Sequence, residues 1–216
     1  MALESKIVDL RQLLAERFPQ VRRNTAAHLA TGLDSLDATT EGGLAKGAIT
    51  ELTSPQVSAG SALLLGRLLD RAMASRYFMV LIDGRDSFDP AGVGDPRLRH
   101  LLWVRCGQAQ EAVRAADLLL RDGNFPLVVL DLVLNPAEEL RKIPASNWYR
   151  LQRLVEATPT AFLVLTQRSM ISSAHWKLTL KNNWRLSDLE QADNFSRLKI
   201  RMQRGQGGRQ EMAGAG

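Results

Sequence analysis

Continuous apolar segments of strand length alternate along this chain with segments of helical spacing. Four of them are Phe78–Ile82, Leu101–Val104, Leu127–Leu130 and Ala161–Thr166, and Ile49–Leu52 is a shorter candidate before them. A strand that is apolar at successive positions is buried on both faces, which is typical of a parallel sheet covered by helices. The sequence therefore predicts an α/β fold with a mostly parallel sheet and right-handed crossovers.

The segments between these strands have helical patterns. Ser61–Arg76 is strongly apolar, and Gln108–Arg121 is followed by Gly123 at the position of a helix C-cap. A third helix is expected over Asn147–Ala157, with Ser146 as a candidate N-cap. These helices would cover the two faces of the sheet.

Near the C-terminus the pattern changes to strict alternation. Apolar residues at 198, 200 and 202 alternate with basic residues at 197, 199 and 201. A period of two predicts a strand with one exposed face, here an antiparallel strand at the sheet edge. We expect Trp184–Leu186 to be its partner. Residues 204–216 are rich in Gly, Gln and Ala, which indicates a flexible basic tail.

The N-terminal segment carries a stripe of apolar residues. Leu3, Ile7, Leu10 and Leu14 fall on one face of a helix over residues 1–20, and residues 21–30 are predicted to be a linker. The core domain would then span residues 31–203. The stripe either packs on this domain or docks on another subunit, and the sequence leaves both open.

Composition excludes several classes of protein. In 216 residues, 45% are hydrophobic, which argues against disorder throughout. The lone cysteine, Cys106, forms neither an internal disulfide nor a Cys-rich zinc site, and the three histidines lack metal-ligand spacing, so no metal site is predicted. No secretion signal or membrane-spanning segment is apparent, so a cytoplasmic protein is expected.

The net charge of +5 is concentrated at the C-terminus. Residues 197–216 contain five basic residues and one acidic residue, and so carry +4 of that charge. The basic residues are Arg197, Lys199, Arg201, Arg204 and Arg209. They could contact DNA phosphates, keep an edge strand solvated, or dock on a partner.

The residues around the strand ends, where open α/β sheets bind ligands, resemble the RecA recombinase core. The resemblance covers about residues 31–203 and rests on the order and spacing of several segments together. These are Thr31–Asp37, Gly42–Leu52, Ser54–Ser61, Leu81–Pro90, Leu127–Asp131 and Leu163–Arg168.

The nucleotide site implied by this resemblance is degenerate. A phosphate-binding loop needs two glycines and a lysine before its Ser or Thr. The corresponding places hold Ser54, Ala59, Gly60 and Ser61, so the lysine is missing. RecA has a glutamate that activates the attacking water where this chain has Arg85, which is no general base at neutral pH.

Two further residues match RecA positions. Asp131 corresponds to the aspartate that helps to hold magnesium, and Gln167 to the glutamine that couples the nucleotide to DNA binding. Without the lysine, no ATPase activity and no cofactor are predicted. Residual nucleotide binding at the start of the helix is the alternative, because helix N-termini bind anions.

A RecA-like core with a degenerate nucleotide site, an N-terminal helix and a basic tail resembles the ImuA family of bacterial mutagenesis proteins. The resemblance implies a non-catalytic adaptor in damage-induced, error-prone translesion synthesis. Its partners would be RecA, an ImuB-like inactive relative of Y-family polymerases and, indirectly, an error-prone polymerase, with DNA a further candidate for the tail. The alternatives are a nucleotide-binding ATPase in DNA repair and a cell-division inhibitor of the SulA type.

Overall fold

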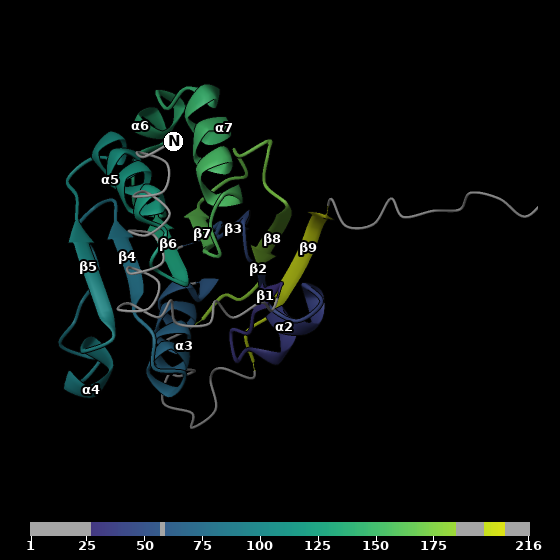
Figure 1. Ribbon diagram of the computed structural model, residues 1–216. Coiled ribbons are helices and arrows are strands. Elements are labelled where there is room, and N and C mark those ends of the chain that lie inside the picture. Colours follow the sequence, from purple (N-terminus) through teal and green to yellow (C-terminus); the bar gives the residue numbers. More distant parts are fainter. Residues whose placement is uncertain (1–26, 57–58, 185–196, 206–216) are drawn as a thin grey trace, which may run out of the picture.

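The computed structural model describes residues 27–56, 59–184 and 197–205. Its main sheet contains β3 (Ala48–Thr53), β4 (Met79–Asp83), β5 (Leu101–Arg105), β6 (Leu127–Asp131), β7 (Ala161–Thr166), β8 (Trp176–Leu180) and β9 (Ile200–Gly205). The seven strands lie in the order β5-β4-β6-β7-β3-β8-β9 (Figure 1). All neighbours from β5 to β8 are parallel, and β9 is antiparallel to β8. The expected α/β class and RecA-like layout are confirmed.

Helices cover both faces of this sheet (Figure 1). On one face α3 (Ser61–Ala74) packs through Leu64 and Leu68, and on the other face lie α5 (Ala109–Asp122) and α7 (Ala145–Glu156). Along β7, Leu163 belongs to the α3 core and Phe162 to the α5–α7 core. Burial on both faces is the physical reason for the continuous apolar strands.

Shorter elements complete the fold. The short helices are α2 (Asp34–Thr39), α4 (Asp95–Leu98) and α6 (Ala137–Arg141), and an antiparallel ribbon pairs β1 (His28–Leu29) with β2 (Leu44–Ala45). Because β1 lies within residues 21–30, the segment predicted as a linker contributes to the folded core. No helix in the described ranges is long and apolar enough to cross a membrane.

Two local predictions are wrong. The partner of β9 is β8, whereas Trp184 lies beyond the end of β8 and outside any strand. Lys177 and Thr179 interrupt the apolar pattern of β8, because only one face of this strand joins the α3 core. The second error is Ser146 as an N-cap: α7 begins at Ala145, so Ser146 lies inside its first turn.

The predicted helix over residues 1–20, with its stripe of Leu3, Ile7, Leu10 and Leu14, lies outside the described residues, as does the tail beyond residue 205. The C-terminal strand itself is present, but it begins at Ile200. Before it, Leu198 is buried at 1% exposure, whereas Met202 is 38% exposed, so only part of the alternating apolar face is covered.

Candidate functional site

The strand register brings the degenerate phosphate loop and Asp131 to the same edge of the sheet. Thr53, directly before the loop, pairs with Thr166 of β7, and the neighbouring Leu165 pairs with Asp131 of β6. β3, which leads into the loop, and β6, which ends at Asp131, are therefore two strand spacings apart, a distance of about 10 Å. This is the arrangement that the sequence comparison with RecA implied.

The loop after β3 is held by its own backbone. The amide of Ser54 donates to the carbonyl of Thr166 at 2.7 Å, and the Ser54 hydroxyl donates to the carbonyl of Gln56 at 3.0 Å. The N-cap of α3 is Gly60, with a φ of 107° and no side-chain cap hydrogen bond, so Ser61 is the first helical residue and not the cap. Ala59, at the place before that glycine, is fully buried.

An aromatic side chain covers the glycine of this loop. A Cβ added to Gly60 would lie 2.9 Å from Nε1 of Trp184 and 3.3 Å from Cδ1 of Leu198. The guanidinium of Arg197 lies 5.5 Å from the centre of the Trp184 ring. Trp184 and Leu198, from the C-terminal part of the chain, thus lie against Gly60. Gly60 stands at the place where a phosphate loop carries its lysine.

Arg85 connects three elements of the fold. Its Nη1 donates to the carbonyl of Gly107 at 3.1 Å and to Oε1 of Glu139 at 3.4 Å. Glu139 also accepts hydrogen bonds from the amide of Ala109 and from Nδ2 of Asn135, and these bonds lower the pKa of its carboxyl. Arg85 therefore connects the turn after β4 to α6 through hydrogen bonds. Because its guanidinium is permanently charged, Arg85 accepts no proton from water and is no general base.

The aspartates near this edge bind backbone groups. Asp83 is buried and accepts the amides of Ser87 and Phe88 at 2.8 and 2.7 Å, which closes the turn after β4. Asp131 accepts the amide of Val133 at 2.9 Å. Burial is the main cause that raises the pKa of Asp131 to about 6, so its carboxyl ionises less readily than a free aspartate.

Glu51 in the middle of β3 is a buried carboxylate that the sequence reasoning did not single out. Its Oε1 accepts the amides of Met170 and Ile171 at 2.6 and 3.0 Å, and its Oε2 accepts the hydroxyl of Ser169 at 2.8 Å. The ammonium of Lys177 lies 3.7 Å from Oε2. The signal was a glutamate inside an otherwise apolar and Thr-containing strand, where a charge needs partners.

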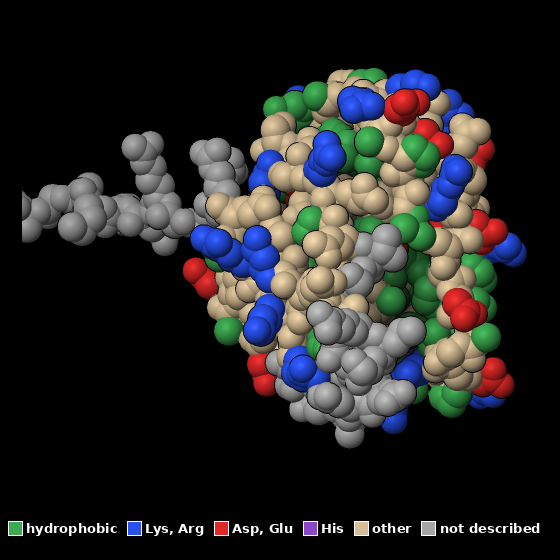
Figure 2. Space-filling model, turned by 180° about the vertical axis from the view of Figure 1, so that it is seen from behind, with side chains coloured by type: hydrophobic (Ala, Val, Ile, Leu, Met, Phe, Trp, Pro, Cys, Tyr) green, Lys and Arg blue, Asp and Glu red, His purple; other side chains and the backbone are tan. Residues whose placement is uncertain are grey.

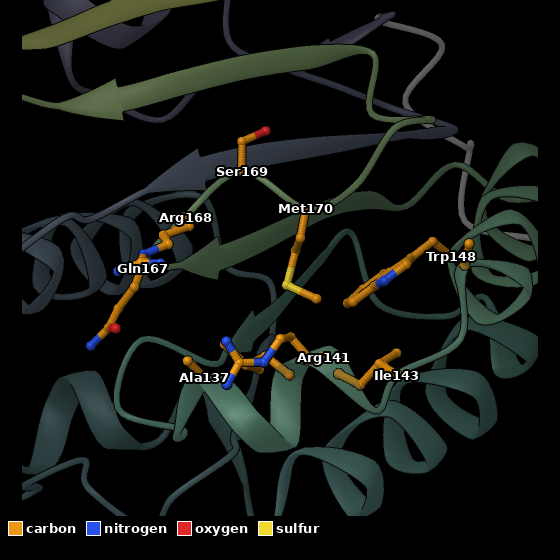
Figure 3. Close-up of a pocket in the computed structure, with 10 residues that line it drawn as sticks. Ala137, Arg141, Ile143, Trp148, Gln167, Arg168, Ser169 and Met170 are labelled. Carbon is orange, nitrogen blue, oxygen red and sulfur yellow. The ribbon is translucent and has the colours of Figure 1, made fainter.

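The loop that Glu51 holds forms one wall of a pocket of about 350 Å³. The pocket lies between α6, α7 and residues 167–170 after β7 (Figure 3). Figure 3 shows Met170 and Trp148 pointing toward each other across it, with Ile143 and Arg141 nearby and Ser169 pointing away. Gln167, which matches the RecA glutamine, is also part of the lining.

The basic residues of the C-terminal strand lie at the surface. Arg197, Lys199 and Arg201 are exposed, while the side chain of Arg204 and all of Arg209 lie outside the described part. Seen from behind in Figure 2, Lys and Arg side chains gather on the side of the molecule that carries β8 and β9. Over the described ranges, no group of three or more His, Cys, Asp or Glu side chains is placed to hold a metal ion.

Comparisons with known proteins add no further assignment. No protein-family model matches this chain, and the search of curated proteins found no match.

Proposed function

We propose that this chain is a non-catalytic, RecA-like adaptor in damage-induced, error-prone translesion DNA synthesis. In this role it binds RecA and an ImuB-like inactive Y-family polymerase, and through the latter it reaches an error-prone polymerase. Its place of action is the bacterial cytoplasm at the nucleoid. The work of the protein is binding, and no reaction takes place at its sheet edge.

The observation that carries the proposal is the remodelled phosphate loop on an otherwise RecA-like sheet. Gly60 is packed against Trp184, and no lysine stands in the loop to meet a terminal phosphate. Arg85 occupies the place of the catalytic glutamate and is bound to Glu139 and Gly107. Hydrolysis needs both a phosphate clamp and a group that orients water, so the missing lysine and the arginine at position 85 support a role in binding.

The retained fold supports a binding role. Buried apolar cores lie on both faces of the sheet, so the domain can present surfaces to partners on a packed framework although its loop lacks the lysine of a nucleotide site. The apolar stripe of Leu3, Ile7, Leu10 and Leu14 and the basic C-terminal strand then offer partner surfaces at the two ends of the chain.

Co-purification tests this proposal. The tagged full chain is expressed with RecA and an ImuB-like protein from the same bacterium, and recovery of both partners is measured. We expect both to be retained. Ile7→Glu with Leu10→Glu, which breaks the apolar stripe, should reduce recovery of at least one partner, whereas Gln12→Glu on the opposite face of the predicted helix should not.

Failure of the intact chain to retain either partner would overturn the adaptor role. Micromolar binding of a fluorescent ATP analogue with magnesium would favour the nucleotide-binding alternative. Filamentation of cells on expression, with recovery of the tubulin-like division protein, would favour a division inhibitor.

A further inference from the structure

The pocket between α6, α7 and the loop after β7 has features of a preformed binding site. Its volume of about 350 Å³ lies at the small end of the range for ligand sites. Leu140, Ile143, Trp148 and Met170 supply an apolar lining, and Trp148 is only 3% exposed. Such a pocket accepts one or two large apolar side chains and is too small for a folded surface.

The wall formed by residues 167–170 is fixed from below. Glu51 accepts the amides of Met170 and Ile171, and the hydroxyl of Ser169. Because the carboxylate of Glu51 is fully buried, these bonds form in a low-dielectric interior, where they are strong. The loop therefore holds its shape without a ligand, which reduces the ordering cost of binding.

The charge around the pocket has one sign. Arg141 and Arg168 line it with exposed side chains, and among the described residues neither forms an ion pair. No carboxylate belongs to the lining. Of the acidic residues on α6, Glu139 is bound to Arg85, Asn135 and the amide of Ala109, and Glu138 is exposed outside the lining.

We infer that this pocket binds a short acidic peptide of a partner protein, in which a large apolar side chain enters the pocket and flanking carboxylates meet Arg141 and Arg168. Apolar anchors in pockets with complementary charges at the rim are typical of such interfaces. The inference rests on the proposed adaptor function for the idea that the peptide belongs to another protein.

Two other occupants fit the pocket less well. The apolar stripe of this chain lies in residues 1–20, which contain three acidic and three basic residues and so offer no excess of negative charge. Single-stranded nucleic acid would use a stripe of cations with exposed aromatic rings, whereas this pocket has two arginines and a buried tryptophan.

Fluorescence polarisation with the purified full chain tests the inference. The probe is a labelled peptide, Asp-Glu-Leu-Phe-Asp-Glu, and we expect saturable binding. Two control peptides replace the flanks by Lys-Arg or the centre by Ser-Gly, and each should bind at least about tenfold more weakly, because one lacks the charge and the other lacks the anchor.

Variants then locate the binding. Arg141→Glu with Arg168→Glu should weaken the acidic peptide about tenfold, and the loss should shrink at high salt. Arg153→Glu, an exposed arginine of α7 outside the lining, is the matched control and should bind as the natural chain does. Ala137→Trp, at an exposed position of the lining, should fill the pocket and abolish binding. Thermal melts verify that each variant is folded.

Equal affinity for the acidic and basic peptides, or unchanged binding by Arg141→Glu with Arg168→Glu, would overturn the inference. So would displacement of the peptide by an equimolar DNA oligonucleotide. A gain of tenfold or more in Leu10→Glu would assign the pocket to this chain's own N-terminal segment. Peptide binding without recovery of RecA or the ImuB-like protein would contradict only the adaptor role. Recovery of these partners without peptide binding would contradict only the peptide site.

Discussion

Replacement of Glu51 by alanine removes the carboxylate that connects β3 to the loop after β7. The side chain is fully buried and accepts three hydrogen bonds, two of them from the backbone amides of Met170 and Ile171. In Glu51→Ala these two amides, one buried and one partly buried, lose their acceptor, and Lys177 loses the carboxylate 3.7 Å away. We therefore expect a large loss of stability.

The magnitude follows from the hydrogen bonds that are lost. A buried donor left without its acceptor costs about 1–3 kcal/mol, so the two amides together cost about 2–6 kcal/mol. A domain of this kind has a free energy of unfolding of about 5–15 kcal/mol, so the loss is a large share of the total. At about 2–4 °C per kcal/mol, the melting temperature of Glu51→Ala should fall by roughly 4–24 °C.

Urea unfolding followed by circular dichroism measures this loss. Lys177→Met is the comparison variant. It removes the cation at 3.7 Å and its 3.3 Å hydrogen bond to Ser169, but all three hydrogen bonds to the Glu51 carboxylate stay in place, so it should cost less than Glu51→Ala. Glu51→Gln keeps an oxygen acceptor for the amides and should lie between the two. A loss below about 1 kcal/mol in Glu51→Ala would show that the loop does not depend on this carboxylate.

Three further predictions concern other parts of the sheet edge. Gly60→Ala should lower the free energy of unfolding by about 1–2 kcal/mol, because its φ of 107° and the 2.9 Å approach of Trp184 disfavour a Cβ; an unchanged urea midpoint would contradict this. Folding raises the pKa of Asp131 from 3.8 to about 6, so the folded state holds its proton more tightly than the unfolded chain. The free energy of unfolding should therefore fall by up to about 3 kcal/mol as the pH rises from about 4 to about 6. Urea titrations at successive pH values measure this fall, and Asp131→Asn should remove it. Burial, with Glu111 and Asp83 nearby, raises the pKa of the Cys106 thiol, so a disulfide reagent should label it at least about tenfold more slowly than in the urea-unfolded chain; equal rates would contradict its burial.

The interior of the sheet was predictable because its strands are buried on both faces. Ala161–Thr166 has the predicted bounds, and Gly123 ends α5 in the left-handed conformation that a helix C-cap requires. These features depend on local pattern and on the conformational freedom of one residue. The strands near one edge were harder to predict. β8 lies next to the edge strand β9, and only its alternate residues Trp176, Leu178 and Leu180 join the α3 core, so its apolar signal is halved.

The candidate site was predictable only in part. Sequence order placed the Ser54 loop and Asp131 at one edge, because strand ends in a parallel sheet meet there. Trp184 packs against Gly60, which lies 124 positions earlier in the chain. The hydrogen bonds of Glu51 likewise connect β3 to a loop that follows it by more than 100 residues. Such contacts follow from tertiary packing, which no local pattern reports.

Titration of the full chain with a fluorescent ATP analogue and excess magnesium tests most directly whether this RecA-like core has lost its nucleotide chemistry. We expect no saturable signal up to about 1 mM nucleotide, because the loop has no lysine and Trp184 packs on Gly60. A micromolar dissociation constant that Ser61→Ala or Asp131→Asn weakens at least about tenfold would contradict it and would place a working nucleotide site at this edge of the sheet.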